Sequence, residues 1–214
     1  MMRLLPLLVF TLFFSGQSSI ELHRLLRSAI ESGDVTAVSE LLAKGADAEV
    51  KLRKGMNSVM LASLGGNEGV VAVLLASVPE GESRGRLAEM GVLTAISQDH
   101  ASVLSLLLDA GASPEAANKH GSTALMLAAF KGRADIVALL LSRGASVNAI
   151  DSDTMTALMH AARSGHAGAI KQLIAAGARL STREKESKSN ALHMASSADC
   201  LECVTALLAA GAKL

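Results

Sequence analysis

Residues 118–149 read NKHGSTALMLAAFKGRADIVALLLSRGASVNA, and this stretch decides the fold. A turn ends at Gly121, an apolar segment follows over residues 124–129, and Gly132 interrupts it. A second apolar segment then runs to Gly144. Glycine is the usual residue where a turn needs a positive φ and where a helix ends in a left-handed cap. The pattern therefore predicts two short helices joined by a tight turn.

Local signals place the ends of both helices. Ser122 or Thr123 can accept a backbone N–H and cap the first helix. Asp135 lies in the first turn of the second helix, where a carboxylate suits the positive end of the helix dipole. The apolar residues at 136–141 give this helix one hydrophobic stripe. Neither helix is long enough to bury that stripe without a neighbour.

The end of this pattern recurs along the chain as two apolar residues, two spacers and Gly-Ala. A degenerate copy, Leu74-Leu75 followed by Val78-Pro79, fills the one gap in the series. The glycine positions, with residue 78 in the gap, step by 33, 33, 33, 33 and 34 residues. A fixed period of this size is typical of a stacked solenoid. The five glycines are Gly45, Gly111, Gly144, Gly177 and Gly211.

A small residue recurs in each first helix on the same period. A methyl group allows neighbouring helices to approach closely, whereas a larger side chain would push the units apart. These positions are therefore expected to lie at the contacts between units. They are Ala29, Ala62, Ala95, Ala128, Ala161 and Ala195.

These motifs resemble the ankyrin repeat, which runs Gly-x-Thr-Pro-Leu-His-x-Ala-Ala, Gly-His and Ile-Val-x-x-Leu-Leu-x-x-Gly-Ala. Alanine replaces the proline of the family at Ala124, Ala157 and Ala191, a change that keeps the helix start. The resemblance covers residues 20–214 and implies an all-α, ankyrin-type helix-turn-helix solenoid of stacked repeats of about 33 residues. The matching segments are residues 121–129, 156–162, 165–166 and 190–193.

Six units follow from this period. The second is expected to end in an irregular loop around Pro79 and residues 80–83, and the third has Asp99-His100 where Gly-His is expected. The sixth carries an extra residue in the polar segment 181–189. Terminal units of a stack commonly depart from the pattern because they cap it. The units span residues 20–50, 51–83, 84–116, 117–149, 150–182 and 183–214.

Residues 1–18 differ from the rest. Arg3 is followed by an apolar run over residues 4–14 and by small polar residues at 15–19. This is the three-part shape of a secretory signal peptide, with cleavage expected after Ser18. The run is too short to span a bilayer. The alternative is an apolar helix that covers the open end of the array, in which case the protein would be cytoplasmic.

Composition narrows the class of partner. The 214 residues include 20 Lys and Arg and 20 Asp and Glu, so the formal net charge is zero. A general nucleic-acid binder needs a basic field to meet phosphates, so we expect no nucleic-acid partner. Trp and Tyr are absent and Phe occurs 4 times, so the core must be aliphatic.

Cys200 and Cys203 form the most conspicuous small motif. A redox pair of this type usually lies near a βαβ pattern, which is missing here. In register Cys203 takes a buried position and Cys200 a surface one, so a small buried hydrophobe and a surface thiol are expected. A local disulfide becomes the alternative if the chain is exported.

Other chemistry finds little support. With His193 the two cysteines supply three zinc ligands where four are needed. The resemblance implies a structural His193 that satisfies loop backbone, so a Cys200–His193 nucleophilic pair is disfavoured. We expect no enzyme activity, no cofactor and no metal.

The remaining candidate is a surface. In the ankyrin family the concave face is built from the turn tips and the outer side of the first helices, and it binds proteins. Exposed aromatic or methionine side chains beside arginine and lysine are typical of an interface centre. The tip positions are Arg53, Lys54, Met56, Arg86, Glu89, Lys119, His120, Ser122, Ser152, Asp153 and Met155, and the helix positions are Leu64, Gln98, Phe130, Lys131, Arg163 and Ser164.

The sequence thus predicts a non-catalytic, monomeric scaffold that binds a partner protein on its concave face. Export into the secretory pathway is expected if residues 1–18 are a signal peptide. One alternative is a regulatory or targeting domain of a larger protein. Another is a thiol-dependent enzyme that uses Cys200.

Overall fold

The computed structural model describes the backbone of residues 5–53 and 55–213 and the side chains of residues 19–52 and 55–213. These described residues form twelve helices and one short hairpin. The hairpin pairs β1 (Lys51–Arg53) with β2 (Met56–Asn57). The helix pairs are α1 (Leu5–Ser32) with α2 (Val35–Ala43), α3 (Ser58–Gly65) with α4 (Glu68–Ala76), α5 (Glu82–Ser97) with α6 (Ala101–Asp109), α7 (Ala124–Lys131) with α8 (Ala134–Ser142), α9 (Ala157–Arg163) with α10 (Ala167–Ala175), and α11 (Ala191–Ser197) with α12 (Leu201–Ala209).

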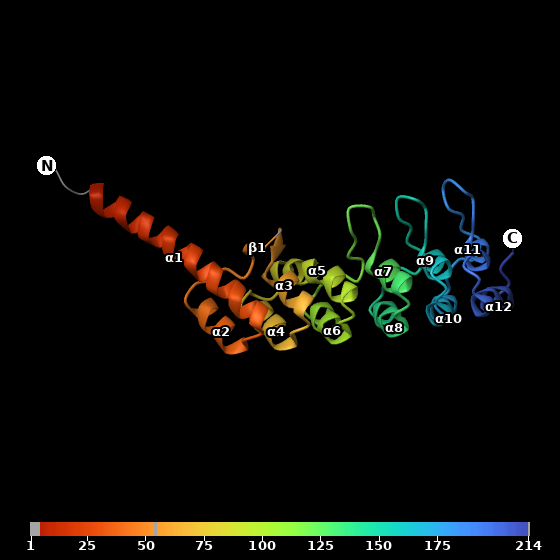
Figure 1. Ribbon diagram of the computed structural model, residues 1–214, viewed down its shortest axis with the longest axis horizontal. Helices are drawn as coiled ribbons and strands as arrows, with labels where there is room; N and C mark the ends of the chain where they lie inside the picture. Colours follow the sequence, from red (N-terminus) through yellow and green to blue (C-terminus); the bar gives the residue numbers. More distant parts are fainter. Residues whose placement is uncertain (1–4, 54, 214) are drawn as a thin grey trace.

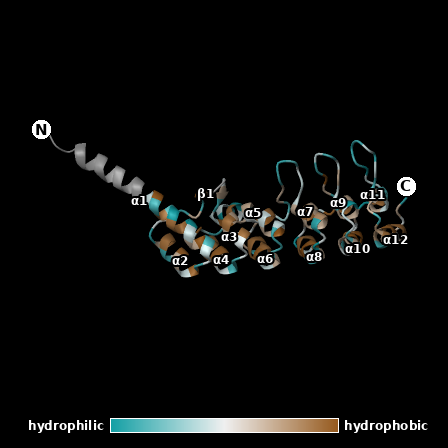
Figure 2. Ribbon diagram, viewed as in Figure 1, coloured by the Kyte–Doolittle hydropathy of each residue, from teal (hydrophilic) through white to brown (hydrophobic). Residues whose placement is uncertain are grey.

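The pairs stack side by side in two layers. In Figure 1 the even-numbered helices form one row and helices α3, α5, α7, α9 and α11 form the other. The loops that precede α7, α9 and α11 project from the same side of the second row. Figure 2 shows hydrophobic residues on the helices and mostly hydrophilic ones in these loops. The predicted all-α helix-turn-helix solenoid is therefore confirmed.

The recurrent alanines lie in the core as predicted. All six are between 0 and 7% exposed. Ala128 on α7 and Ala161 on α9 are both fully buried, and these two helices pack directly against one another. Leu125, Ile136 and Leu140 fill the space between the layers of this unit. The core is thus aliphatic, with a methyl group where helices of neighbouring units meet.

Side chains cap the first helix of most units. The Oγ1 atom of Thr123 accepts the backbone N–H of Met126 at 3.3 Å, which confirms Thr123 as the cap of α7. Asn57, Thr156 and Asn190 play the same part for α3, α9 and α11. Each cap satisfies an N–H that the helix itself cannot pair.

In the first five units the turn between the two helices packs against the next unit. Gly132 ends α7 with φ 72°, and a Cβ there would come within 2.5 Å of the ring of His166. Asp99 takes the equivalent place with φ 67°, a conformation that aspartate tolerates better than most residues. Its carboxylate lies 2.8 Å from Nε of Arg133 in the next unit. The departure from Gly-His in the third unit therefore keeps the turn.

The third unit differs from the prediction. Helix α5 begins at Glu82, so Arg86 and Glu89 lie on a helix and not at a turn tip. The expected irregular loop is correspondingly short. The guanidinium of Arg84 donates two hydrogen bonds to the carbonyl of Val78, at 2.8 and 2.9 Å, and fixes the start of the helix. This contact joins residues six apart in the chain and is not readable from local helix signals.

The predicted signal peptide falls on the first helix. Residues 1–4 lie outside the described residues, and residues 5–18 belong to α1 without described side chains. Cleavage after Ser18 stays a prediction. Within the described residues no helix combines the length and the apolar character that crossing a membrane requires.

We predict that Ala128→Leu lowers the free energy of unfolding by about 1–3 kcal/mol, because the larger side chain overpacks the contact between α7 and α9. Urea denaturation followed by circular dichroism measures the change. Ala175→Leu, on an exposed position of α10, is the control and should stay within about 0.5 kcal/mol of the parent. Equal stability of both variants would contradict the packing described here.

Candidate partner-binding face

One broad surface carries most of the predicted site residues. It is formed by α3, α5, α7, α9 and α11 together with the loops that precede them, and we call it the inner face. Two of the hollows that predicted site residues line lie over α3 and α5 and beside α9 and α11, and α7, which carries Phe130, lies between these helices in the stack. Lys54 lies outside the described residues, and of Arg53 only the backbone, in β1, is described.

The C-terminal hollow lies between the loops of the fifth and sixth units and has a volume of about 600 Å³. It brings together Asp153, Met155 and Arg163 from the predicted set. Glu184 and Glu186, in the polar segment before α11, add two carboxylates that the sequence reading missed. The other lining residues are Ser187, Ser189, His193, Met194, Ser197 and Ala198.

The N-terminal hollow lies over α3 and α5 and has a volume of about 440 Å³. Arg86 and Glu89 from the predicted set line it, beside Met60, Met90 and Leu93. Met90 is 54% exposed although it stands at the position that Thr123 occupies in the fourth unit. An apolar residue in a capping position was the available sequence signal for this hollow. Ala116 and Ala117 complete the lining.

Asp151 organises the loop beside the C-terminal hollow. Its Oδ1 atom accepts the backbone N–H groups of Asp153 and Met155, at 3.0 and 2.9 Å. Its Oδ2 atom lies 2.9 Å from Nε2 of His160 on α9. Nδ1 of His160 is buried and has no hydrogen-bond partner among the described residues. The neutral tautomer with its proton on Nε2, donating to Asp151, fits this environment.

Met155 was expected to be exposed, and this expectation is wrong. It is only 4% exposed, because the turn built by Asp151 directs its side chain into the protein. Its Sδ atom lies 3.7 Å from Nη1 of Arg163. Arg163 itself is exposed, and within the described part of the chain it makes no ion pair. A guanidinium is therefore available at the wall of the hollow.

Phe130 and Leu64 are exposed as predicted, at 47% and 40%. The ring of Phe130 meets the ring of His160 edge-on, with centroids 6.4 Å apart and planes at 87°. His160 is held in turn by Asp151, so Phe130 rests on an ordered neighbour.

The other predicted residues lie outside both hollows. Met56 is half-buried, and the exposed ones are Gln98, Lys119, His120 and Lys131.

Glu184 keeps its charge over a wide pH range. Hydrogen bonds from the backbone N–H of Glu186, the hydroxyl of Ser187 and the backbone N–H of Ser187 lower the pKa of its carboxyl from 4.5 to about 2. These three donors favour the ionised form. The carboxylate of Glu184 is therefore ionised at neutral pH.

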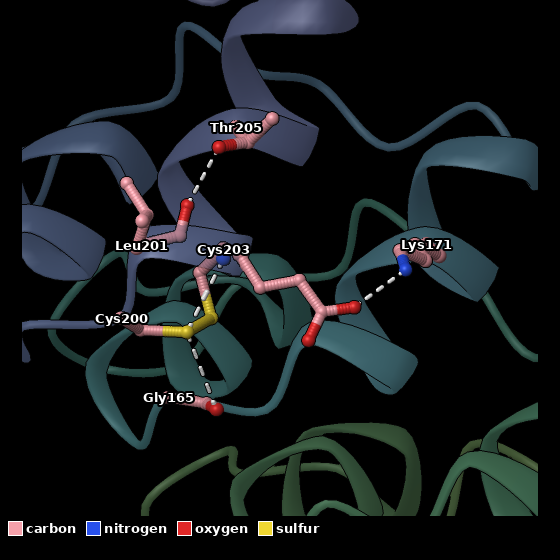
Figure 3. Close-up of a disulfide and its surroundings, with 7 residues drawn as sticks. Gly165, Lys171, Cys200, Leu201, Cys203 and Thr205 are labelled. Atoms are coloured by element: carbon pink, nitrogen blue, oxygen red, sulfur yellow. Dashed lines mark hydrogen bonds and ion pairs between the residues drawn. A yellow bond between two sulfur atoms is a disulfide. The ribbon is translucent and has the colours of Figure 1, made fainter.

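The cysteines differ from the expected buried hydrophobe and free surface thiol. Cys200 and Cys203 are joined in a disulfide (Figure 3). The predicted burial of Cys203 is confirmed, and Cys200 is partly exposed.

His193 bonds through Nδ1 to Oδ1 of Asn190, at 2.7 Å, and not to loop backbone. Among the described residues no group of three or more His, Cys, Asp or Glu could hold a metal ion.

Comparison with known proteins shows which family has this sequence and fold. The family of ankyrin repeats (3 copies) matches residues 87–151 and 144–214. This protein belongs to the ankyrin repeat family. None of the curated proteins compared with it matches. The resemblance read from the repeated motifs is thus confirmed.

Two solved structures illustrate the likeness of this ankyrin protein to others. One is a chain of the complex between Bd0816, a predatory endopeptidase from Bdellovibrio bacteriovorus, and immunity protein Bd3460. The two chains are 30% identical, the match covers 86% of this chain and 97% of that chain, and the TM-score is 0.72. The other is an ankyrin repeat domain from Acinetobacter baumannii AYE, with 24% identity, coverage of 88% and 98%, and a TM-score of 0.76. The second likeness concerns the fold alone.

We predict that Asp151→Ala destabilises the protein by about 2 kcal/mol, because two loop N–H groups and the buried His160 lose their partner. Asp151→Asn is the matched control. It keeps an oxygen for the two N–H groups and should cost less than half as much. Thermal denaturation of both variants at neutral pH measures the difference. A loss as large in Asp151→Asn as in Asp151→Ala would contradict this role.

The titration of Glu184 gives a second prediction. Because folding lowers its pKa, the ionised carboxyl stabilises the folded state above pH 4.5, and this contribution fades as the pH falls toward about 2. The melting temperature of the parent should therefore exceed that of Glu184→Gln near neutral pH and converge with it near pH 2. A carboxyl titration midpoint near 4.5 by NMR would contradict the hydrogen-bonded turn.

Proposed function

We propose that the protein is a non-catalytic binding module that holds a partner protein on its inner face. The observation that carries this proposal is the exposed ring of Phe130 between two hollows, with Arg163 unpaired in the described residues at the wall of one of them. An apolar centre flanked by polar and charged side chains is typical of a protein interface. Membership of the ankyrin family supports the same use.

The two hollows favour different partner side chains. Asp153, Glu184 and Glu186 outnumber the single guanidinium of Arg163 in the C-terminal hollow, so it favours a lysine or arginine of the partner. Met60, Met90 and Leu93 make the N-terminal hollow apolar, and flexible methionine side chains adapt to an inserted aliphatic or aromatic group. The partner surface would therefore carry an apolar residue and a cation at opposite ends of its contact.

A hydrolytic enzyme is the partner class that the comparisons favour. The chain shares 30% identity over 97% of a chain from a complex of an endopeptidase with an immunity protein. We propose that this protein binds an endopeptidase and restrains it. The test is whether an equimolar amount of this protein inhibits peptide hydrolysis by a candidate endopeptidase. Binding without inhibition would leave the scaffold role and remove the inhibitory one.

Export forms part of the proposal. The predicted signal peptide and the Cys200–Cys203 disulfide are both typical of a protein that leaves the reducing cytosol. N-terminal sequencing of the mature protein tests this. A start at or near Ser19 is expected, and an intact Met1 or Met2 would contradict export.

We predict that Phe130→Ala weakens partner binding at least about 10-fold, as loss of a central aromatic anchor does, while the melting temperature changes by only a few degrees. The partner is first captured with a photo-crosslinking residue placed at position 130, and its affinity is then measured calorimetrically. The control position is Gln172, exposed on α10 in the other row of helices.

Crosslinking of the same partner from both positions would contradict an inner-face site. So would a large loss of stability in Phe130→Ala, which would make Phe130 a core residue. Gln172→Ala should bind as the parent does.

A further inference from the structure

The Cys200–Cys203 pair has a geometry that the binding function does not use. Cys200 is the N-cap of α12, and Cys203 lies one turn further along the helix. Cys203 is fully buried, whereas Cys200 is partly exposed. Figure 3 shows the disulfide at the start of the helix, facing the turn that contains Gly165. Cys200 is therefore the residue of the pair that solvent reaches, while Cys203 is enclosed.

The fold does not need this bond. Five other units form the same turn without cysteine, and their N-cap residues are Asp34, Asn67, His100, Arg133 and His166. In the sixth unit the backbone already fixes the turn. The N–H of Cys200 bonds to the carbonyl of Ala195 at 3.3 Å, and the N–H of Val204 bonds to the carbonyl of Cys200 at 3.0 Å. The cross-link encloses two residues and so restrains the unfolded chain less than a long loop would.

The surroundings also accommodate the reduced pair. The backbone N–H of Cys203 points at Sγ of Cys200, 3.2 Å away, and would donate to a thiolate there. The N-terminal end of α12 favours negative charge at the same place. The carbonyl oxygen of Gly165 lies 3.5 Å from this sulfur and can accept a thiol proton. The Cys200 sulfur therefore has both a donor and an acceptor beside it that could serve its reduced form.

Nearby charges are largely neutralised or solvated. Glu202, in the first turn of α12, pairs with Lys171 of the preceding unit, with Oε1 and Nζ 2.6 Å apart (Figure 3). Asp199, next to Cys200, is exposed to solvent.

We propose that Cys200 and Cys203 form a thiol–disulfide exchange site for a dithiol. One thiolate of the dithiol attacks Sγ of Cys200, the bond to Cys203 breaks, and Cys203 leaves as a thiolate that takes up a proton. The second thiolate of the dithiol then attacks the first sulfur of the dithiol, which is bonded to Cys200. Cys200 leaves as a thiolate and takes up a proton. Two electrons and two protons pass to the pair, and the dithiol becomes a disulfide. The reverse sequence reduces a disulfide of the reaction partner and restores the Cys200–Cys203 bond.

Single-cysteine variants test the assignment of the two sulfurs. Cys203→Ser and Cys200→Ser are each treated with glutathione disulfide under native conditions, and the mixed disulfide is followed by mass spectrometry. Cys200 should react at least about 100-fold faster than Cys203, which must wait for local opening of α12. Equal rates, or a faster Cys203, would overturn the proposal.

The parent protein supplies the second arm. Dithiothreitol should reduce it in the absence of denaturant, with the far-UV circular dichroism and the urea midpoint nearly unchanged. Reduction that occurs only together with unfolding would make the bond purely structural and overturn the proposal. The urea midpoints of both variants are measured first, and Cys→Ala replaces Cys→Ser where a serine variant is unfolded. Partner binding measured in parallel separates this result from the proposed function.

Discussion

Every level of the structure depends on the close approach of helices from neighbouring units. A helix of seven or eight residues, such as α7 or α9, has too few internal hydrogen bonds to persist alone in water. The buried alanines at positions such as 128 and 161 allow the next helix to come near enough to cover its apolar side. The repeat period, the absence of large aromatic core residues among the described side chains and the elongated two-layer shape all follow from this contact.

Polar contacts between units add to this packing. The side chain of Asn148 bonds to the carbonyl of Gly177 at 3.2 Å and accepts the N–H of Arg179 at 2.8 Å. Asp99 pairs with Arg133, and Lys171 pairs with Glu202, each across one unit boundary. Each is a nearest-neighbour contact, so each unit is positioned by the units beside it. The loops and the exposed ring of Phe130 gain their fixed spacing from this positioning.

The features that the sequence predicted are those set by local chemistry. The cap at Thr123 depends on residues close together in the chain, and the glycines and alanines recur at a fixed period that the sequence displays. The missed features depend on particular side-chain contacts that no repeat position signals. Helix α5 starts early because Arg84 reaches the carbonyl of Val78, and Met155 is buried because Asp151 joins its loop to His160. The hollows likewise arise between units, so only some of their residues could be named beforehand.

The central claim is that the units stabilise one another only through their immediate neighbours. Hydrogen exchange of the backbone amides, read by mass spectrometry, tests it most directly. Nearest-neighbour stabilisation predicts the strongest protection in α7, α8, α9 and α10, which have neighbours on both sides, and weaker protection in α11 and α12, which have one. Protection of α12 equal to that of α8 would contradict it.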